Sequence, residues 1–228
     1  MIGVFDSGAG GLTALNELRK IQPSVDLCFL ADRKNAPYGT KTRREIIKLV
    51  TNDIKKLRLA GADKILMACC TASTVYPFLP GSLKASVCPI IAPAAKEAAL
   101  VCENGKIGVI ATNATVRSGA FVKEISKYKS VSVTEIPAQE LVFLVESGIK
   151  DGSMTDRARK RLVTLLSPFK AKGIDTLILG CTHFPHLERE ISGILPGVRL
   201  ISPSREGAKE MLRNCLNQRG KGITVYLD

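Results

Sequence analysis

The sequence predicts an α/β fold made of two pseudo-symmetric lobes, each a mostly parallel sheet flanked by helices, with the active site in the cleft between them. Two observations support this prediction. Apolar runs of strand length alternate with amphipathic stretches of helical length, an order that is typical of parallel sheets covered by helices on both faces. The same order then starts again in the second half of the chain, where short segments match segments of the first half.

The first half of the chain is expected to alternate strands with helices. Short apolar runs such as IGVF predict the strands, and the longer amphipathic stretches predict the helices. A Pro-Gly pair at Pro80 and Gly81 ends the last of these helices. In chain order, we expect a strand over residues 2–5, a helix over 12–21, a strand over 26–31, a helix over 41–60, a strand over 64–68 and a helix over 71–78.

The second half repeats this order and matches the first half at individual positions. Its expected strands cover residues 106–111, 130–135 and 175–179, and its expected helices cover 115–128 and 154–172. IGVF in the first half corresponds to IGVI in the second, and GADKILMAC corresponds to GIDTLILGC. Cys69 and Cys181 end the second pair of segments, so the two cysteines are twins. The two segments share three residues, Gly, Asp and Cys. Two unrelated buried strands can share three residues by chance, so this match alone does not establish a repeat.

The chemistry around the twin cysteines favours a reactive pair. Each cysteine lies at the end of an expected strand and just before an expected helix, where sites form in parallel α/β sheets. Backbone N–H groups at a helix N-terminus favour a thiolate, so we expect the pKa of both thiols to lie below the usual value of about 8.5. Two thiols on opposite sides of a bound molecule suit racemisation or epimerisation beside a carboxylate, because one removes a proton and the other returns one.

The segment DSGAGGLT is a candidate anion-binding loop. Asp6 and Ser7 are followed by Gly8, Gly10 and Gly11, whose backbone N–H groups can hold an anion at the start of a helix. A dinucleotide-binding loop is the alternative. It fits poorly, because a threonine stands where the third glycine or alanine of that motif belongs.

Composition narrows the function classes further. The chain has 228 residues, is 45% hydrophobic and carries a net charge of +12. Its basic clusters, within residues 41–44, 55–58 and 157–161, lack interleaved aromatic residues, so they read as solvated helix faces and nucleic-acid binding is not expected. No apolar run approaches the roughly 18 residues of a membrane span, and no basic leader precedes the first strand. With seven cysteines, an odd number, we expect free thiols and a cytoplasmic location.

No metal site is expected either. Cys181, His183 and His186 are potential zinc ligands, but the chain has only two histidines and Pro185 interrupts their spacing. The expected chemistry therefore uses no metal or other cofactor.

Five ordered motifs resemble the glutamate racemases of the aspartate/glutamate racemase superfamily. They are IGVFDSGAGGLT, APYGTK, ACCTAS, LVESG and LGCTHFP, and the resemblance runs from Ile2 to about Ser204. It implies a first lobe over residues 1–91 and 203–228, completed by the last helix and strand, and a second lobe over 92–202. It also implies interconversion of L- and D-glutamate without a cofactor, D-glutamate supply for peptidoglycan, and a homodimer.

The resemblance also implies roles for individual residues. Cys69 would deprotonate D-glutamate and Cys181 would deprotonate L-glutamate, with Asp6 and His183 as their ionisable neighbours and Glu146 near the second thiol. The residues that the resemblance places around the substrate are Asp6, Ser7, Pro37, Tyr38, Gly39, Cys70, Thr71, Thr182 and His183.

One departure from the family pattern bears on the substrate. Cys70 stands where these racemases usually have asparagine, and a thiol forms weaker hydrogen bonds than an amide. Losing such a bond to a charged substrate costs about 1.5–3 kcal/mol, roughly ten- to hundredfold in affinity, unless another group replaces it. An aspartate racemase, another isomerase acting beside a carboxylate, and a non-catalytic protein that binds anions or nucleic acid therefore stay as alternatives.

Overall fold

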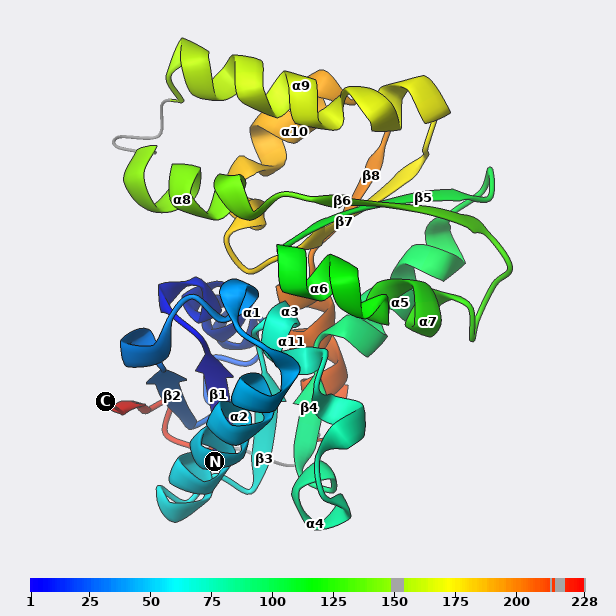
Figure 1. The fold of residues 1–228 in the computed structure, drawn as a ribbon. Coiled ribbons are helices and arrows are strands. Elements are labelled where there is room, and N and C mark those ends of the chain that lie inside the picture. The colour runs from blue at the N-terminus through cyan, green and yellow to red at the C-terminus, as the bar shows by residue number, and fades with distance from the viewer. Residues whose placement is uncertain (149–153, 214, 216–219, 228) are drawn as a thin grey trace.

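Two parallel β-sheets organise the protein, one in each lobe (Figure 1). The computed structural model describes residues 1–148, 154–213, 215 and 220–227. The first sheet has the strand order β4-β3-β1-β2-β9 and the second the order β6-β5-β7-β8. All neighbouring strands run parallel, which confirms the predicted fold class. The strands are β1 (Ile2–Asp6), β2 (Leu27–Ala31), β3 (Lys64–Met67), β4 (Val87–Pro89), β5 (Lys106–Ala111), β6 (Ser132–Pro137), β7 (Thr176–Gly180), β8 (Arg199–Ile201) and β9 (Thr224–Leu227).

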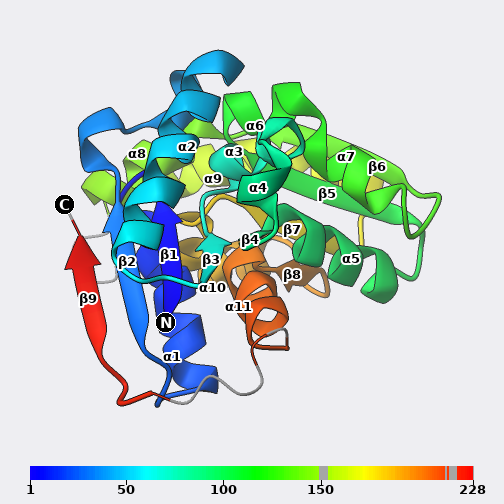
Figure 2. The same ribbon diagram turned by 90° about the horizontal axis from the view of Figure 1, so that it is seen from below.

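Helices cover both faces of the first sheet, because side chains alternate between its faces. Phe5 packs in the apolar cluster that contains the buried side of α2 (Arg43–Leu59). Val4 points the other way, into the cluster formed with α1 (Leu12–Ile21) and α11 (Pro203–Arg213). Strand β9 pairs with the outer edge of β2, so the last strand of the chain joins the sheet of the first half (Figure 2).

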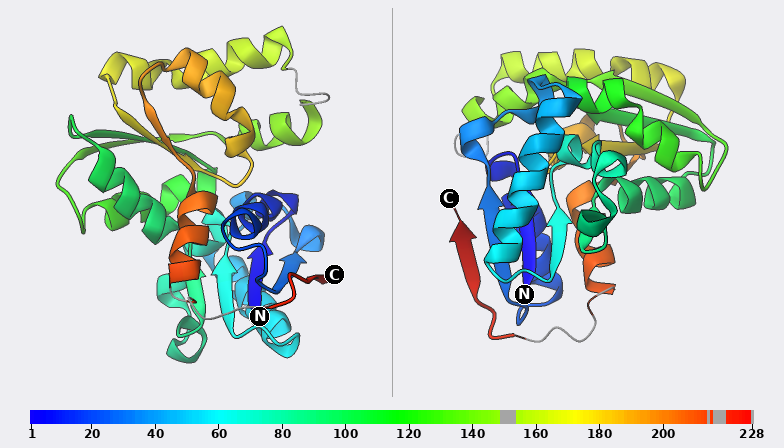
Figure 3. Two further views of the ribbon diagram at one scale, coloured as in Figure 1. Left: turned by 180° about the vertical axis from the view of Figure 1, so that it is seen from behind. Right: turned by 60° about the horizontal axis from the view of Figure 1, so that its bottom comes forward.

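The second sheet is covered in the same way. One face packs on α5 (Ile91–Val101) and α7 (Ala120–Ile125), and the other on α8 (Gln139–Gly148) and α9 (Asp156–Lys172). Helix α11 lies against both α1 and α5, so it joins the two lobes at the back of the molecule (Figure 3). The remaining short helices are α3 (Cys70–Ser73), α4 (Gly81–Lys84), α6 (Asn113–Ser118) and α10 (Glu188–Ile194).

Several expected elements differ from the structure for identifiable reasons. The helix expected over 115–128 is two helices, α6 and α7, because Gly119 between them has a left-handed φ of 60°. The helix expected over 71–78 is only the single turn α3, followed by a 3₁₀ turn that contains a proline, Tyr76–Phe78. Helix α2 begins at Arg43, because the side chains of Thr42 and Glu45 form a capping box there.

The ends of the central strands meet where the two lobes meet. Four residues that lie just beyond strand ends line one cavity. They are Ser7 after β1, Cys69 after β3, Thr112 after β5 and Cys181 after β7. This placement agrees with the rule that sites form beyond the carboxyl ends of parallel strands. Within the described ranges, no helix has the length and apolar character that crossing a membrane requires.

Candidate active site

Cys69 lies at the N-terminus of α3, with its thiol facing the first lobe's glycine-rich loop. The backbone N–H of Ala72 donates to its Sγ at 3.4 Å, as expected for a residue in the N-cap position. The hydroxyl of Ser7 lies 3.5 Å from the same sulfur. Burial, and then the charge of Asp6, raise the pKa of Cys69 to about 11, although the hydrogen bonds from Ser7 and Ala72 lower it.

Cys181 is the matching thiol of the second lobe. Its Sγ lies 3.5 Å from Nδ1 of His183, and the side chain is 8% exposed. Burial again raises the thiol pKa well above its usual value, and the nearby thiol of Cys69 and the charge of Asp6 add to that increase. Cys69 and Cys181 are therefore close enough to influence each other electrostatically.

The prediction that both thiols have lowered pKa values is wrong. The helix N–H contact at Cys69 acts in the expected direction, but it is outweighed by the loss of hydration on burial. The raised pKa values favour the protonated form of both thiols at neutral pH. A high pKa also makes each thiolate a stronger base once it forms, which suits removal of a proton from carbon.

Both thiols line one cavity between the lobes, which brings most of the sequence-predicted site together. Ten of its lining residues come from the predicted set: Ser7, Pro37, Tyr38, Gly39, Cys69, Cys70, Thr71, Cys181, Thr182 and His183. The cavity measures about 40 Å³, little more than the share of one water molecule in the liquid, about 30 Å³. The structure is therefore a closed form, and an amino acid can enter only when the lobes or loops move apart.

Asp6 does not line this cavity itself, but it contacts two residues that do and connects the two lobes. Its carboxylate accepts a hydrogen bond from the backbone N–H of Gly8 at 2.8 Å and another from the hydroxyl of Thr182 at 3.2 Å. A side chain on Gly10 would overlap the Thr182 hydroxyl, so the glycine-rich loop can approach the second lobe only because it lacks side chains.

Tyr38 lines the cavity, but its hydroxyl is engaged elsewhere. The hydroxyl lies 2.6 Å from Oδ2 of Asp32 and 2.9 Å from Oδ2 of Asp53, and the whole side chain is 1% exposed. Burial raises the pKa of Asp53 to about 6. The hydrogen bond that the Tyr38 hydroxyl donates to Asp53 acts against this increase, because it stabilises the carboxylate form. Asp32 also accepts from the side-chain amide of Asn35 at 2.9 Å.

Two polar residues of the cavity are absent from the predicted set. Thr112 stands two residues after IGVI, just as Ser7 stands two residues after IGVF, so the internal repeat carried a signal for it. Its hydroxyl lies 2.9 Å from that of Thr71, across the lobe boundary. Gln139, the first residue of α8, has no comparable signal. The predicted Glu146 belongs to the same helix, and its side chain lies outside the described residues.

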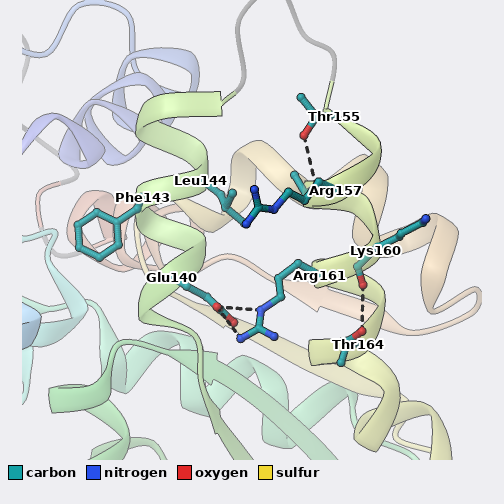
Figure 4. Close-up of a pocket in the computed structure, with 9 residues that line it drawn as sticks. Glu140, Phe143, Leu144, Thr155, Arg157, Lys160, Arg161 and Thr164 are labelled. Atoms are coloured by element: carbon teal, nitrogen blue, oxygen red, sulfur yellow. Dashed lines mark hydrogen bonds and ion pairs between the residues drawn. The ribbon is translucent and has the colours of Figure 1, made fainter.

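A larger cavity of about 720 Å³ lies between α8 and α9 (Figure 4). An ion pair of 2.8 Å between Arg161 and Glu140 spans it, and Arg157 and Lys160 add positive charge. None of its lining residues is a thiol or a histidine, so we assign the chemistry to the smaller cavity. Among the described residues, no three histidine, cysteine or acidic side chains form a group that fits a metal ion.

Comparison with known proteins places this geometry among racemases. The model of the Asp/Glu/Hydantoin racemase family matches residues 15–211 of the chain. The glutamate racemase of Aquifex aeolicus is 38% identical over 226 residues, which are 99% of this chain and 87% of that protein.

Solved structures show the same similarity in three dimensions. The crystal structure of a glutamate racemase from Bacillus anthracis has a TM-score of 0.89 at 30% identity, covering 99% of this chain and 86% of that one. The glutamate racemase of Francisella tularensis in complex with D-glutamate has a TM-score of 0.86 at 32% identity, with the same coverage. The similarity therefore extends over both lobes.

Proposed function

The chain belongs to the Asp/Glu/Hydantoin racemase family, and from this premise we propose that it interconverts L- and D-glutamate. It is an amino-acid racemase, an isomerase. The observation that carries the proposal is the placement of Cys69 and Cys181, which come from twin strand ends and line one cavity. D-Glutamate made in this way serves peptidoglycan synthesis, the general role of these enzymes.

The proposed reaction exchanges the proton on Cα between two thiols. The thiolate of Cys69 removes the proton of D-glutamate, and the thiol of Cys181 then donates its proton to the opposite face of the carbanion. The products are L-glutamate, a thiol at Cys69 and a thiolate at Cys181, and the reverse reaction exchanges the roles. No cofactor takes part.

Each thiol must lose a proton before it can act as the base. Asp6 beside Cys69 and His183 beside Cys181 are the neighbours that we propose to assist this step. The ammonium group of the substrate favours the thiolate as it enters, because a nearby positive charge lowers a thiol pKa. Ser7, Pro37, Gly39, Thr71 and Thr182 line the same cavity, and we propose that they bind the substrate with Asp6, Tyr38, Cys70 and His183. Glu146, on α8, is proposed to act near the second thiol.

Aspartate is the second candidate substrate. Cys70, which stands where glutamate racemases usually have asparagine, lines the cavity and can change which amino acid is bound. Its thiol is buried, its pKa is raised well above the usual value by that burial, and it offers little hydrogen bonding to a carboxylate. One experiment decides between the candidates. The purified protein is incubated without cofactor with L-glutamate, D-glutamate, L-aspartate or D-aspartate, and chiral analysis of each mixture shows which amino acid has been inverted. Inversion of glutamate alone or by preference supports the proposal. Inversion of aspartate by preference supports the alternative, and inversion of neither contradicts both.

Three further properties are also proposed. The lobes comprise residues 1–91 with 203–228 and residues 92–202, which the pairing of β9 with β2 supports. The seven cysteines are free thiols, a state that fits a reducing compartment, and we propose the cytoplasm. A homodimer stays a prediction that light scattering after size-exclusion chromatography checks.

A further inference from the structure

We propose that Gln139 is a substrate-binding residue, whose side-chain amide holds both the α-carboxylate and the α-ammonium group of the amino acid. This inference rests on the proposed racemase function. It assigns the head group of the substrate to a residue at the start of α8 in the second lobe.

The first observation is that the amide of Gln139 is buried without a partner. Neither Nε2 nor Oε1 forms a hydrogen bond with any described residue, and both atoms are shielded from solvent. Burying an amide without hydrogen bonds lowers the stability of the folded protein, so buried amides in folded proteins are usually paired. An unpaired one points to a partner that is bound there in solution, either a water molecule or a ligand. The second observation is where the amide lies. Gln139 lines the cavity that contains Cys69 and Cys181.

The neighbours of the amide place it at the contact between the lobes. Gly39 of the first lobe lies so close that a Cβ on it would overlap Oε1 of Gln139 and come within 3.1 Å of Cβ of Thr112. The hydroxyls of Thr71, Thr112 and Thr115 bond to one another, so these neighbouring groups already have partners. A ligand held by Gln139 therefore touches both lobes when the cavity is closed.

The donor and acceptor of the amide indicate which part of the substrate it binds. Nε2 donates and Oε1 accepts, so a complete partner must offer one acceptor and one donor. The head group of an α-amino acid offers both, because its carboxylate accepts and its ammonium donates. The distal carboxylate of glutamate can only accept and would leave Oε1 unpaired. Cys70 in the same cavity is a weak hydrogen-bonding group, which increases the share of binding that falls to the amide.

The test replaces the amide by groups of similar size. Gln139→Met removes both hydrogen bonds, and Gln139→Glu keeps the shape but places a negative charge beside the substrate carboxylate. We expect the KM for both glutamate enantiomers to rise about ten- to hundredfold in Gln139→Met and at least as much in Gln139→Glu, with kcat changing far less. Glu140→Gln is the matched control, because Glu140 lies next in the chain and pairs with Arg161 on the other cavity. It should leave both constants unchanged.

A second measurement separates the head group from the distal carboxylate. D-Norvaline keeps the head group of D-glutamate and lacks the distal carboxylate. Its inhibition constant should rise by the same factor as the KM of D-glutamate in Gln139→Met. A loss confined to glutamate would show that the amide reads the distal carboxylate and would overturn the proposal, as would unchanged constants. Thermal unfolding of each variant shows that it is folded.

Calorimetric binding of D-glutamate separates this proposal from the proposed function. If the wild-type protein binds D-glutamate but does not racemise it, the proposed function fails, and weaker binding by Gln139→Met still supports the role of the amide. Equal binding by the wild-type protein and Gln139→Met overturns that role alone. A wild-type protein that binds no amino acid overturns both.

Discussion

The hydroxyl of Thr182 donates a hydrogen bond of 3.2 Å to Oδ2 of Asp6, from the second lobe to the first. Thr182 directly follows Cys181, and Asp6 ends β1, so this bond connects the segment of one thiol to the acid beside the other. Both partners are buried, so neither is readily satisfied by water when the other is removed.

Thr182→Val removes this hydroxyl while keeping the shape of the side chain. Because a buried carboxylate loses a donor, we expect the free energy of unfolding to fall by about 1–3 kcal/mol. We also expect a lower kcat, because the position of the neighbouring Cys181 is less well fixed. Urea unfolding and steady-state kinetics measure the two effects. Thr182→Ser keeps the donor and should behave like the wild-type protein, and equal losses in both variants would contradict the role of the bond.

Asp53 predicts a specific pH dependence of stability. Burial raises its pKa from 3.8 to about 6, so the folded protein binds a proton that the unfolded chain releases. Stability from this source is complete below pH 3.8 and is lost as the pH rises through 6. The loss corresponds to about 3 kcal/mol at pH 7. In Asp53→Asn the group does not ionise, so its free energy of unfolding should rise relative to the wild-type protein between pH 4.5 and 7.5, as measured in urea.

Asp63→Asn provides a contrasting control for that experiment. Asp63 is exposed and pairs with the N-terminal ammonium at 2.9 Å, which lowers its pKa. Its contribution to stability is present above its unfolded pKa and is lost as the pH falls, the opposite sign to that of Asp53. A difference between Asp53→Asn and the wild-type protein that does not change with pH would contradict a raised pKa at Asp53.

The pKa of Cys69 predicts how activity depends on pH. With a value of about 11, the fraction of thiolate in the free enzyme increases tenfold for each pH unit near neutrality. The value of kcat/KM for D-glutamate, which reports ionisation of the free enzyme, should therefore rise about tenfold per unit from pH 6.5 to 8.5. Initial rates at low substrate concentration measure it. A plateau beginning below pH 8 would mean that the thiol is already ionised in the empty site.

Cys70→Ala tests whether the third thiol of the cavity contributes to catalysis. Cys70 is buried in the apolar core cluster, and no step of the proposed reaction uses its sulfur. We expect kcat for glutamate to stay within about threefold of the wild-type value, with a stability loss of about 1 kcal/mol from the small cavity that is created. A loss of activity comparable to that of Cys69→Ser would assign chemistry to Cys70.

Much of the fold was predictable because its signals are local. Continuous apolar runs predicted the central strands β1, β3, β5 and β7, since both faces of these strands are buried. The short edge strands β4 and β8 have only three residues each and carry too little pattern to be found. Helix α5 was missed as well. It is rich in alanine and has only a weak contrast between its faces, because it packs against α7 on one side and α11 on another.

The candidate site was predictable where motif residues follow strands. The twin cysteines and Asp6 lie at strand ends, and the repeat and the motifs identified them. Three features depended on the tertiary structure. The thiol pKa values follow from burial, the Tyr38 hydroxyl is directed toward Asp53 from α2, and Gln139 reaches the cavity only because α8 begins there. Burial and contacts between distant segments are not encoded in a local pattern.

Exchange of the Cα proton in D₂O tests the two-thiol account most directly. Purified wild-type protein, Cys69→Ser, Cys181→Ser and the control Cys88→Ser, whose thiol lies outside the cavity, are each given L- and D-glutamate. Deuterium at Cα and chirality are followed together. The account predicts that the wild-type protein and Cys88→Ser form inverted glutamate carrying deuterium. In Cys69→Ser and in Cys181→Ser, the rate of inversion should fall by about 10²- to 10⁴-fold. Inversion that persists without Cys69 or without Cys181, or inverted glutamate that keeps its original proton, would contradict it.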